Sequence, residues 1–138
     1  MPISAGQWTD VLIGHQYLNL ETFRRSGVGV RTPVWFAEDQ GRLFVRTQAD
    51  SGKVKRIRHQ TRVRLVPSDA QGNPKGEWIE ARAQLAPPEQ ADLAQRLFRK
   101  KYGLQLRGFE VMMKLRGGSW ATIRIDSPAE RAAGGEET

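Results

Sequence analysis

The residues best suited to chemistry lie in one short segment, where a predicted strand runs into a basic helix. Thr47 and Ser51 carry hydroxyl donors, and Gly52 allows the backbone to approach an anion closely. The free amides at the start of a helix add partial positive charge. Lys53 and Arg56 are three residues apart, so they share one helix face and both could reach the same phosphate. The segment predicts a phosphate site, although these residues would also suit a solvated basic helix end.

The positive charge of the chain is concentrated around this segment. The net charge is +7, and residues 42–64 alone hold eight Lys/Arg and one Asp. Such a patch attracts an anionic partner, either a phosphorylated small molecule or a nucleic-acid backbone. A nucleic-acid-binding small β-barrel is therefore the main alternative, with Tyr17, Trp35 and Phe44 available for base stacking. Only the basic patch supports that alternative, and we do not expect a nucleic-acid partner.

Several reaction classes are excluded by residues and motifs that the sequence lacks. It has no cysteine, which excludes disulfides, thiolate nucleophiles, zinc ribbons and iron–sulfur clusters. His15 and His59 lie far apart among polar neighbours, so we predict no metal site. There is no dinucleotide fingerprint, Walker loop or GxSxG elbow, and no pairing of acids with histidines that would signal hydrolysis. If the chain is an enzyme, a bound cofactor must supply the reactive atom.

The chain is expected to form one soluble domain. Its 138 residues, 38% hydrophobic and 27% charged, are enough for one buried core. No run approaches the roughly 20 apolar residues of a membrane span, and the amino terminus has no export signal, so we expect no membrane partner and a cytoplasmic location. We predict the domain over residues 1–126. The small, polar residues 127–138 are predicted to form a disordered tail.

Alternation of apolar and polar residues predicts six strands. Pro33 removes a ladder donor from the second strand, which places this position at a sheet edge or at an interruption. In the fifth strand, Ala81 and Ala83 are expected to face inward, and such small side chains suit a tight barrel interior. The predicted strands cover residues 17–23, 28–36, 42–47, 62–66, 78–85 and 120–125.

One full helix and two short helices are predicted between these strands. The short helices are the opening segment, residues 7–15, and the basic segment after Ser51. The full helix begins near Pro88 and ends at Gly103, a typical helix-ending residue. Together, the predicted elements describe a mainly β (α+β) chain with six antiparallel strands. This composition favours a small β-barrel over an α/β sheet.

Three segments in this order, YLNLETFR at 17–24, TPVWF at 32–36 and SGKVKRI at 51–57, carry a family resemblance. They resemble the split β-barrel flavoproteins related to pyridoxamine 5′-phosphate oxidase. Two later segments, GEWIEARA at 76–83 and KYG at 101–103, resemble the subgroup of deazaflavin (F-420)-dependent oxidoreductases. The match extends over roughly residues 8–125 of the chain.

This resemblance implies a six-stranded antiparallel split β-barrel of the FMN-binding type. In the family the barrel is a homodimer, and a flavin or deazaflavin lies in a groove at the dimer interface. Carried over by position, the residues that would bind the cofactor phosphate are Thr47, Ser51, Gly52, Lys53 and Arg56. This agrees with the phosphate site predicted from the residue types alone.

The resemblance also implies residues for the cofactor ring. Pro33, Val34 and Trp35 would line it, with the strand backbone near its reactive edge. Trp78, Lys101 and Tyr102 are further candidates that would reach across from the partner chain. Trp78 would equally suit interface packing, since aromatic side chains are enriched there, and Lys101 would equally suit helix termination.

The implied function is that of a flavin- or deazaflavin-dependent oxidoreductase. Full pyridoxamine phosphate oxidases have additional carboxy-terminal substrate-binding segments, which this chain lacks after Ile125, so we do not expect vitamin B6 oxidation. Hydride transfer between the cofactor and a small unsaturated or quinone-like substrate fits better. FMN and the deazaflavin coenzyme F-420 share a ribityl phosphate, so the predicted anchor does not distinguish them. A flavin-binding protein without turnover and a haem-product reductase of the same barrel type are alternatives.

Overall fold

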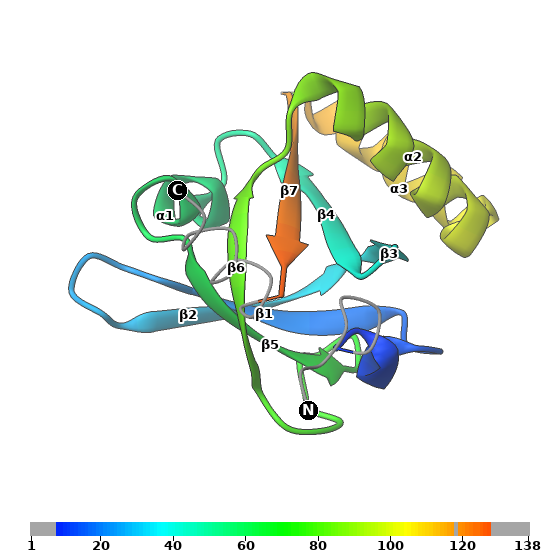
Figure 1. The fold of residues 1–138 in the computed structure, drawn as a ribbon. Coiled ribbons are helices and arrows are strands. Elements are labelled where there is room, and N and C mark those ends of the chain that lie inside the picture. The colour runs from blue at the N-terminus through cyan, green and yellow to red at the C-terminus, as the bar shows by residue number, and fades with distance from the viewer. Residues whose placement is uncertain (1–7, 118, 128–138) are drawn as a thin grey trace.

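A curled antiparallel sheet forms the body of the protein (Figure 1), of which a computed structural model describes residues 8–117 and 119–127. Its strand order is β2-β1-β5-β6-β7-β4-β3, and every neighbouring pair is antiparallel. The mainly β, antiparallel architecture is therefore confirmed. The strands are β1 (Tyr17–Phe23), β2 (Gly29–Trp35), β3 (Ala37–Asp39), β4 (Arg42–Gln48), β5 (Arg62–Ser68), β6 (Ile79–Leu85) and β7 (Trp120–Asp126).

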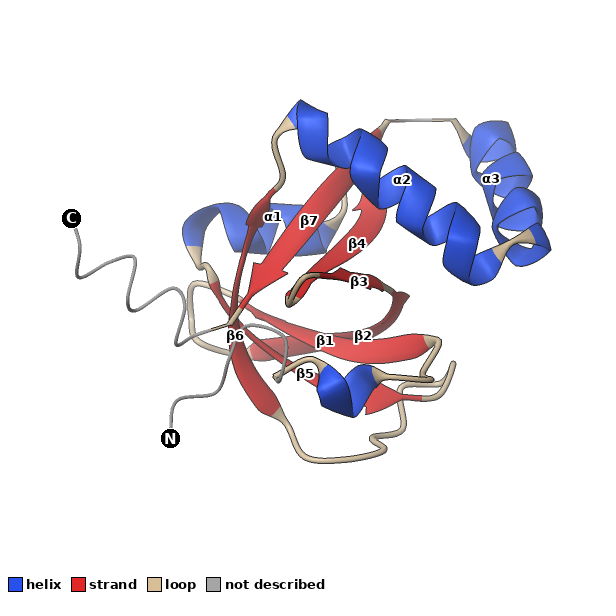
Figure 2. Ribbon diagram, turned by 45° about the vertical axis from the view of Figure 1, so that its right-hand side comes forward, coloured by secondary structure: helices blue, strands red, loops and turns tan. Residues whose placement is uncertain are grey.

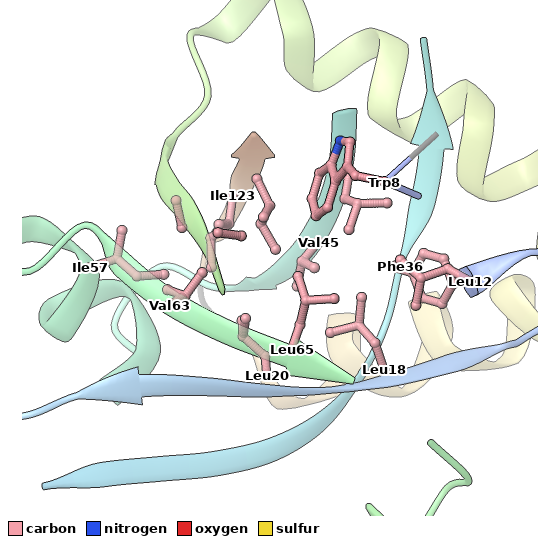
Figure 3. Packing of buried hydrophobic residues seen from close by; sticks show 14 residues of the cluster. Trp8, Leu12, Leu18, Leu20, Phe36, Val45, Ile57, Val63, Leu65 and Ile123 are labelled. Carbon is pink, nitrogen blue, oxygen red and sulfur yellow. The ribbon is translucent and has the colours of Figure 1, made fainter. Parts of the chain in front are cut away.

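The hydrophobic core lies inside the curl of this sheet (Figure 3). Alternate residues of β1, β4, β5, β6 and β7 belong to this core, and Leu18 and Leu20 of β1 are completely buried. Ala81 and Ala83 of β6 belong to the same core, as the alternation predicts. Trp8 packs on it ahead of β1 and donates a hydrogen bond from its indole nitrogen to the Gly41 carbonyl at 2.6 Å. This core fixes which strand faces look outward.

The described part of the chain places three α-helices beside the sheet: α1 (Gly52–His59), α2 (Pro88–Tyr102) and α3 (Leu104–Arg116). The predicted α1 and α2 are present, but α3 was not predicted. Its apolar residues are spread around the helix instead of forming one stripe, so the sequence shows no clear helical period. The predicted opening helix is reduced to one 3-10 turn, η1 (Asp10–Leu12), within the described residues. None of the described helices is long and apolar enough to cross a membrane.

The sheet closes at a single residue, Phe36. It joins β2 to β3, which are the first and last strands of the sheet order, so the sheet has to curl back on itself (Figure 2). The sequence predicts one continuous strand over residues 28–36 and six strands in all. The described residues form seven strands, because the extended chain changes partner at Phe36: β2 pairs with β1, whereas β3 pairs with β4.

The backbone of Phe36 is held by the end of α2. A residue between two strands loses its ladder partners, and its buried amide and carbonyl must be paired elsewhere. The Tyr102 hydroxyl accepts a hydrogen bond from the Phe36 amide at 3.0 Å, and the Lys101 ammonium donates to the Phe36 carbonyl at 2.9 Å. The same hydroxyl lies 2.6 Å from the carbonyl oxygen of Gln16, just ahead of β1. The end of α2 is thus fastened to the corner of the barrel.

The predicted carboxy-terminal tail falls almost entirely outside the described residues. Of residues 127–138, only Ser127 is described, and it is buried. The predicted disorder of the remainder stays a prediction.

Replacing Tyr102 with Phe tests the closure of the barrel. The change removes the hydroxyl but keeps the ring, and it leaves the buried Phe36 amide without its acceptor. We expect the free energy of unfolding to fall by about 1–3 kcal/mol, measured by urea denaturation. The matched control is Tyr17→Phe, since the Tyr17 hydroxyl makes no hydrogen bond within the described part of the chain. An equal effect of both changes would show that Phe36 is not held in this way.

Candidate functional site

A pocket of about 320 Å³ lies between the barrel and the two long helices. The start of β1, the end of β2, the end of β4 and the start of β7 contribute to it, together with one residue each from α1, α2 and α3. Its volume is in the range of small-molecule sites. Segments far apart in the sequence therefore meet around one opening.

The end of the edge strand β2 forms one wall of this pocket. Pro33, Val34 and Trp35 all line it. Pro33 pairs with Asn19 of β1 in the strand register, and β2 has no partner strand on its other side in the sheet order. The missing amide proton of Pro33 therefore costs no ladder hydrogen bond. The edge position predicted for Pro33 is confirmed.

Aromatic rings make up a second wall. Trp35 stacks on Tyr102 with centroids 4.2 Å apart and an interplanar angle of 7°. Along the pocket wall, the ring centroid of Phe109 lies 5.2 Å from that of Trp35. The ring centroid of Trp120 lies 5.5 Å from that of Phe109. Tyr17 and Phe98 also line the pocket. Such a surface suits a planar aromatic ligand, because flat rings gain both apolar contact and favourable ring geometry there.

The other end of the pocket is cationic. Arg46 and Lys53 line it beside Thr47 and Gln48. Burial lowers the pKa of Lys53, and the nearby Arg56 charge lowers it further. Neither Arg46 nor Lys53 has an ion-pair partner among the described residues. A bound anion would compensate both for the loss of hydration.

The surroundings of Arg46 shift its pKa in both directions. Burial is the largest influence and lowers the pKa of Arg46, while the Glu110 carboxylate of α3 raises it and Arg99 lowers it. The Arg46 guanidinium also lies over the Trp120 ring, 5.1 Å from its centroid. This contact links the cationic end of the pocket to its aromatic wall.

The predicted phosphate segment surrounds the start of α1. The Ser51 hydroxyl caps this helix by accepting from the Val54 amide at 3.4 Å, and the Thr47 hydroxyl donates to Ser51 at 3.4 Å. The Arg56 guanidinium is held elsewhere, because its Nε donates to the Thr22 hydroxyl at 2.6 Å.

Gly52 makes room for this Arg56 conformation. A β-carbon added at Gly52 would lie 2.6 Å from a guanidinium nitrogen of Arg56, which is too close for a real contact. Thr47 and Lys53 therefore line the pocket, whereas Ser51, Gly52 and Arg56 form the helix start beside it. Whether Lys53 and Arg56 share one phosphate stays a prediction.

Trp78 lies away from the pocket, in a cluster on the outer face of the sheet. The guanidinium of Arg31 lies over its ring at 4.4 Å and that of Arg64 at 5.2 Å. Both arginines donate hydrogen bonds to the buried carboxylate of Glu21, at 3.0 and 3.2 Å. The single chain thus places Trp78 in an ion-pair cluster and not beside the other predicted site residues.

Lys101 also lies outside this pocket. Together with Asp10 and Glu38 it lines a second cavity of about 250 Å³. Its side chain as a whole is exposed, but its ammonium nitrogen lies 3.4 Å from the centroid of the Phe36 ring. Burial of this end lowers the pKa of Lys101 to about 8. Within one chain, Lys101 supports the barrel corner.

Phe109 and Trp120 were missed by the sequence analysis as pocket residues. Phe109 belongs to the helix that was not predicted. Trp120 begins β7 opposite Gln48 of β4, and this pairing across residues far apart in the sequence brings it to the pocket. No local pattern could reveal that proximity. Among the described residues, no group of three or more potential ligands could hold a metal ion.

Comparison with known proteins shows the fold. No protein-family description and no curated protein matches the sequence. A candidate pyridoxamine 5′-phosphate oxidase from Listeria innocua matches with a TM-score of 0.59 and 15% identity, over 88% of this chain and 90% of that one. The protein has the split β-barrel fold of the pyridoxamine 5′-phosphate oxidase-like proteins. The predicted fold type is therefore confirmed, with seven strands in place of six.

Other structures of this split-barrel type bind different groups. An FAD-binding protein from Mesorhizobium loti matches with a TM-score of 0.61 and 17% identity, over 91% of this chain and 89% of that one. A haem storage protein from Vibrio cholerae matches with a TM-score of 0.65 and 12% identity, over 91% of both chains. The chain spans only 56% of a longer protein of unknown function from Agrobacterium tumefaciens, at 17% identity and a TM-score of 0.65. The fold alone therefore does not select a cofactor.

The pH dependence of stability tests the environment of Lys101. Its folded-state pKa of about 8 lies below the ordinary 10.5, so between these values the folded protein releases a proton that the unfolded chain keeps. Stability should therefore rise with pH across this window relative to Lys101→Met, in parallel urea denaturations from pH 7 to 10.5. The quantity compared is the free energy of unfolding of the wild type minus that of Lys101→Met. If it stayed constant or fell with pH, burial would not lower the pKa of Lys101 in the folded protein.

Proposed function

We propose that this protein is a flavin- or deazaflavin-dependent oxidoreductase with its cofactor in the 320 Å³ pocket. The observation that carries the proposal is the pairing of an aromatic wall with two half-buried cations, Arg46 and Lys53, that have no ion-pair partner in the described chain. A flavin phosphate has the matching features, a planar ring system at one end and an anion at the other. The flavin-binding neighbour of the same fold supports this choice.

The residues of this chain have distinct tasks in the proposed complex. Trp35 and Phe109 offer ring faces to the cofactor, and Tyr102 holds the Trp35 ring from outside the pocket. Lys53 and Arg46 would neutralise the phosphate, with the Thr47 hydroxyl as a further donor. When bound, the cofactor would supply hydride transfer to or from a small unsaturated or quinone-like substrate.

The cofactor identity and the assembly belong to the same proposal. FMN and F-420 would both satisfy the cationic end, and we take FMN as the first candidate. We propose that two copies form a homodimer, with Trp78 and Lys101 contributing to the groove from the partner subunit. This would explain why these two predicted site residues lie apart from the pocket within one chain.

Haem is the second candidate group, because a haem storage protein shares the fold. Haem iron takes an axial ligand such as His, Cys, Met or Tyr. Of these, the described lining of the pocket offers only Tyr17, whereas the cationic end would suit the propionates of haem as well as a phosphate. The scarcity of axial ligands therefore favours a flavin-type ligand over haem.

The proposal is tested by the absorption spectrum of the purified protein and by the mass of the molecule released on denaturation. A two-band flavin spectrum with the mass of FMN is expected. A single violet band with a deazaflavin mass would support the F-420 alternative. A colourless protein that takes up neither cofactor on titration, but binds oligonucleotide, would contradict the proposal.

Replacing Lys53 with Ala tests the phosphate anchor. Loss of a half-buried charge that contacts an anion should weaken FMN binding by about tenfold or more in a fluorescence titration. Lys55→Ala is the matched control, because Lys55 lies on the same helix with its side chain exposed. Full affinity in the Lys53 variant would refute the anchor.

A further inference from the structure

Helix α3 exposes an apolar stripe on the side that does not pack against the protein. Leu104 is 81% exposed and Leu115 is 84% exposed, with Val111 at 60% and Met112 at 49% between them. Their spacing places all four on one helix face. Leu106, on the opposite face, is buried against α2 and the barrel corner. The helix is therefore apolar on two sides, and only one side is covered by described residues.

Basic residues lie along one edge of this stripe. Arg107 and Lys114 are exposed, and they lie one helical turn before and after Val111 on the same side of α3. Residues 96–116, which cover the second half of α2 and all of α3, carry seven Lys/Arg and one Glu. Figure 2 shows the two helices as a pair at one end of the molecule. This end thus combines apolar contact area with strong positive charge.

Charge decides which partner suits the stripe. A second copy docked stripe against stripe would bring two strongly positive helical pairs together, which is unfavourable. The proposed homodimer meets instead through the face that carries Trp78 and Lys101. A nucleic acid would neutralise the charge but leave the leucines exposed to water. An anionic lipid surface satisfies both features, because apolar side chains enter the interface while Lys and Arg meet the headgroups.

We propose that the α3 face formed by Leu104, Val111, Met112 and Leu115 docks peripherally on an anionic lipid bilayer. The sequence analysis expected no membrane partner because it found no span, but docking needs only one exposed helix face. The proposal does not depend on the cofactor, since none of these four residues lines the pocket.

Vesicle flotation of the full chain tests the proposal. We compare vesicles of phosphatidylcholine alone with vesicles that also contain phosphatidylglycerol. Binding to the anionic vesicles is expected to be at least about tenfold stronger, and to weaken in high salt. No binding to anionic vesicles, or equal binding to both kinds, would overturn it.

Two double variants distinguish binding through the stripe from non-specific binding through any exposed apolar side chain. Leu104→Gln with Leu115→Gln should reduce binding to anionic vesicles by about tenfold or more. The matched control is Ile13→Gln with Val28→Gln, whose side chains are 76% and 58% exposed elsewhere on the surface. Equal binding by both double variants would overturn the proposal. All four positions are exposed, and a thermal melt verifies that the variants fold.

The charged flank has its own control, and the oligomeric state tests the rival partner. Arg107→Gln with Lys114→Gln should weaken vesicle binding, whereas the exposed pair Arg25→Gln with Lys75→Gln should not. Sedimentation of the same proteins detects self-association. If the leucine variant turned a dimer into a monomer and no protein floated with vesicles, the stripe would be an interface between copies and the proposal would be wrong.

Discussion

The barrel corner at Phe36 is the constraint on which the rest of the structure depends. The sheet can close only because one residue leaves the ladder between β2 and β3, and that residue then needs new partners for its amide and carbonyl. Tyr102 and Lys101 supply them from the end of α2. The contacts that hold the corner of the barrel therefore also hold the end of α2 against it.

The same corner also shapes the pocket. Trp35 immediately precedes Phe36, and its ring stacks on that of Tyr102. A side chain that fixes the backbone therefore also fixes the aromatic wall. The cationic end is set separately, by the end of β4 and the capped start of α1. Two independent elements of the fold thus place the two halves of the proposed binding site.

The sequence predicted the parts of the fold that are governed by local periodicity. Six of the strands lie within two residues of their predicted bounds, because apolar and polar residues alternate along most of their sequences. The basic helix start was visible from its residue types. The short β3 was not, because it continues an extended run without any break in composition. Helix α3 was hidden by apolar residues on two sides.

The candidate site was only partly predictable for a related reason. Thr47, Lys53 and the Pro33 to Trp35 segment could be proposed from local patterns and resemblance, and they do line one pocket. Phe109 and Trp120 reach it through long-range packing, which leaves no local signal in the sequence.

The central claim is that the pocket binds a planar ring with one phosphate at its cationic end. The most direct measurement compares FMN with riboflavin by calorimetric titration of the cofactor-free protein. The account predicts that FMN binds at least about tenfold more tightly than riboflavin, and that added salt reduces this difference. Equal affinities for the two ligands would contradict it, because Arg46 and Lys53 would then have no part in binding.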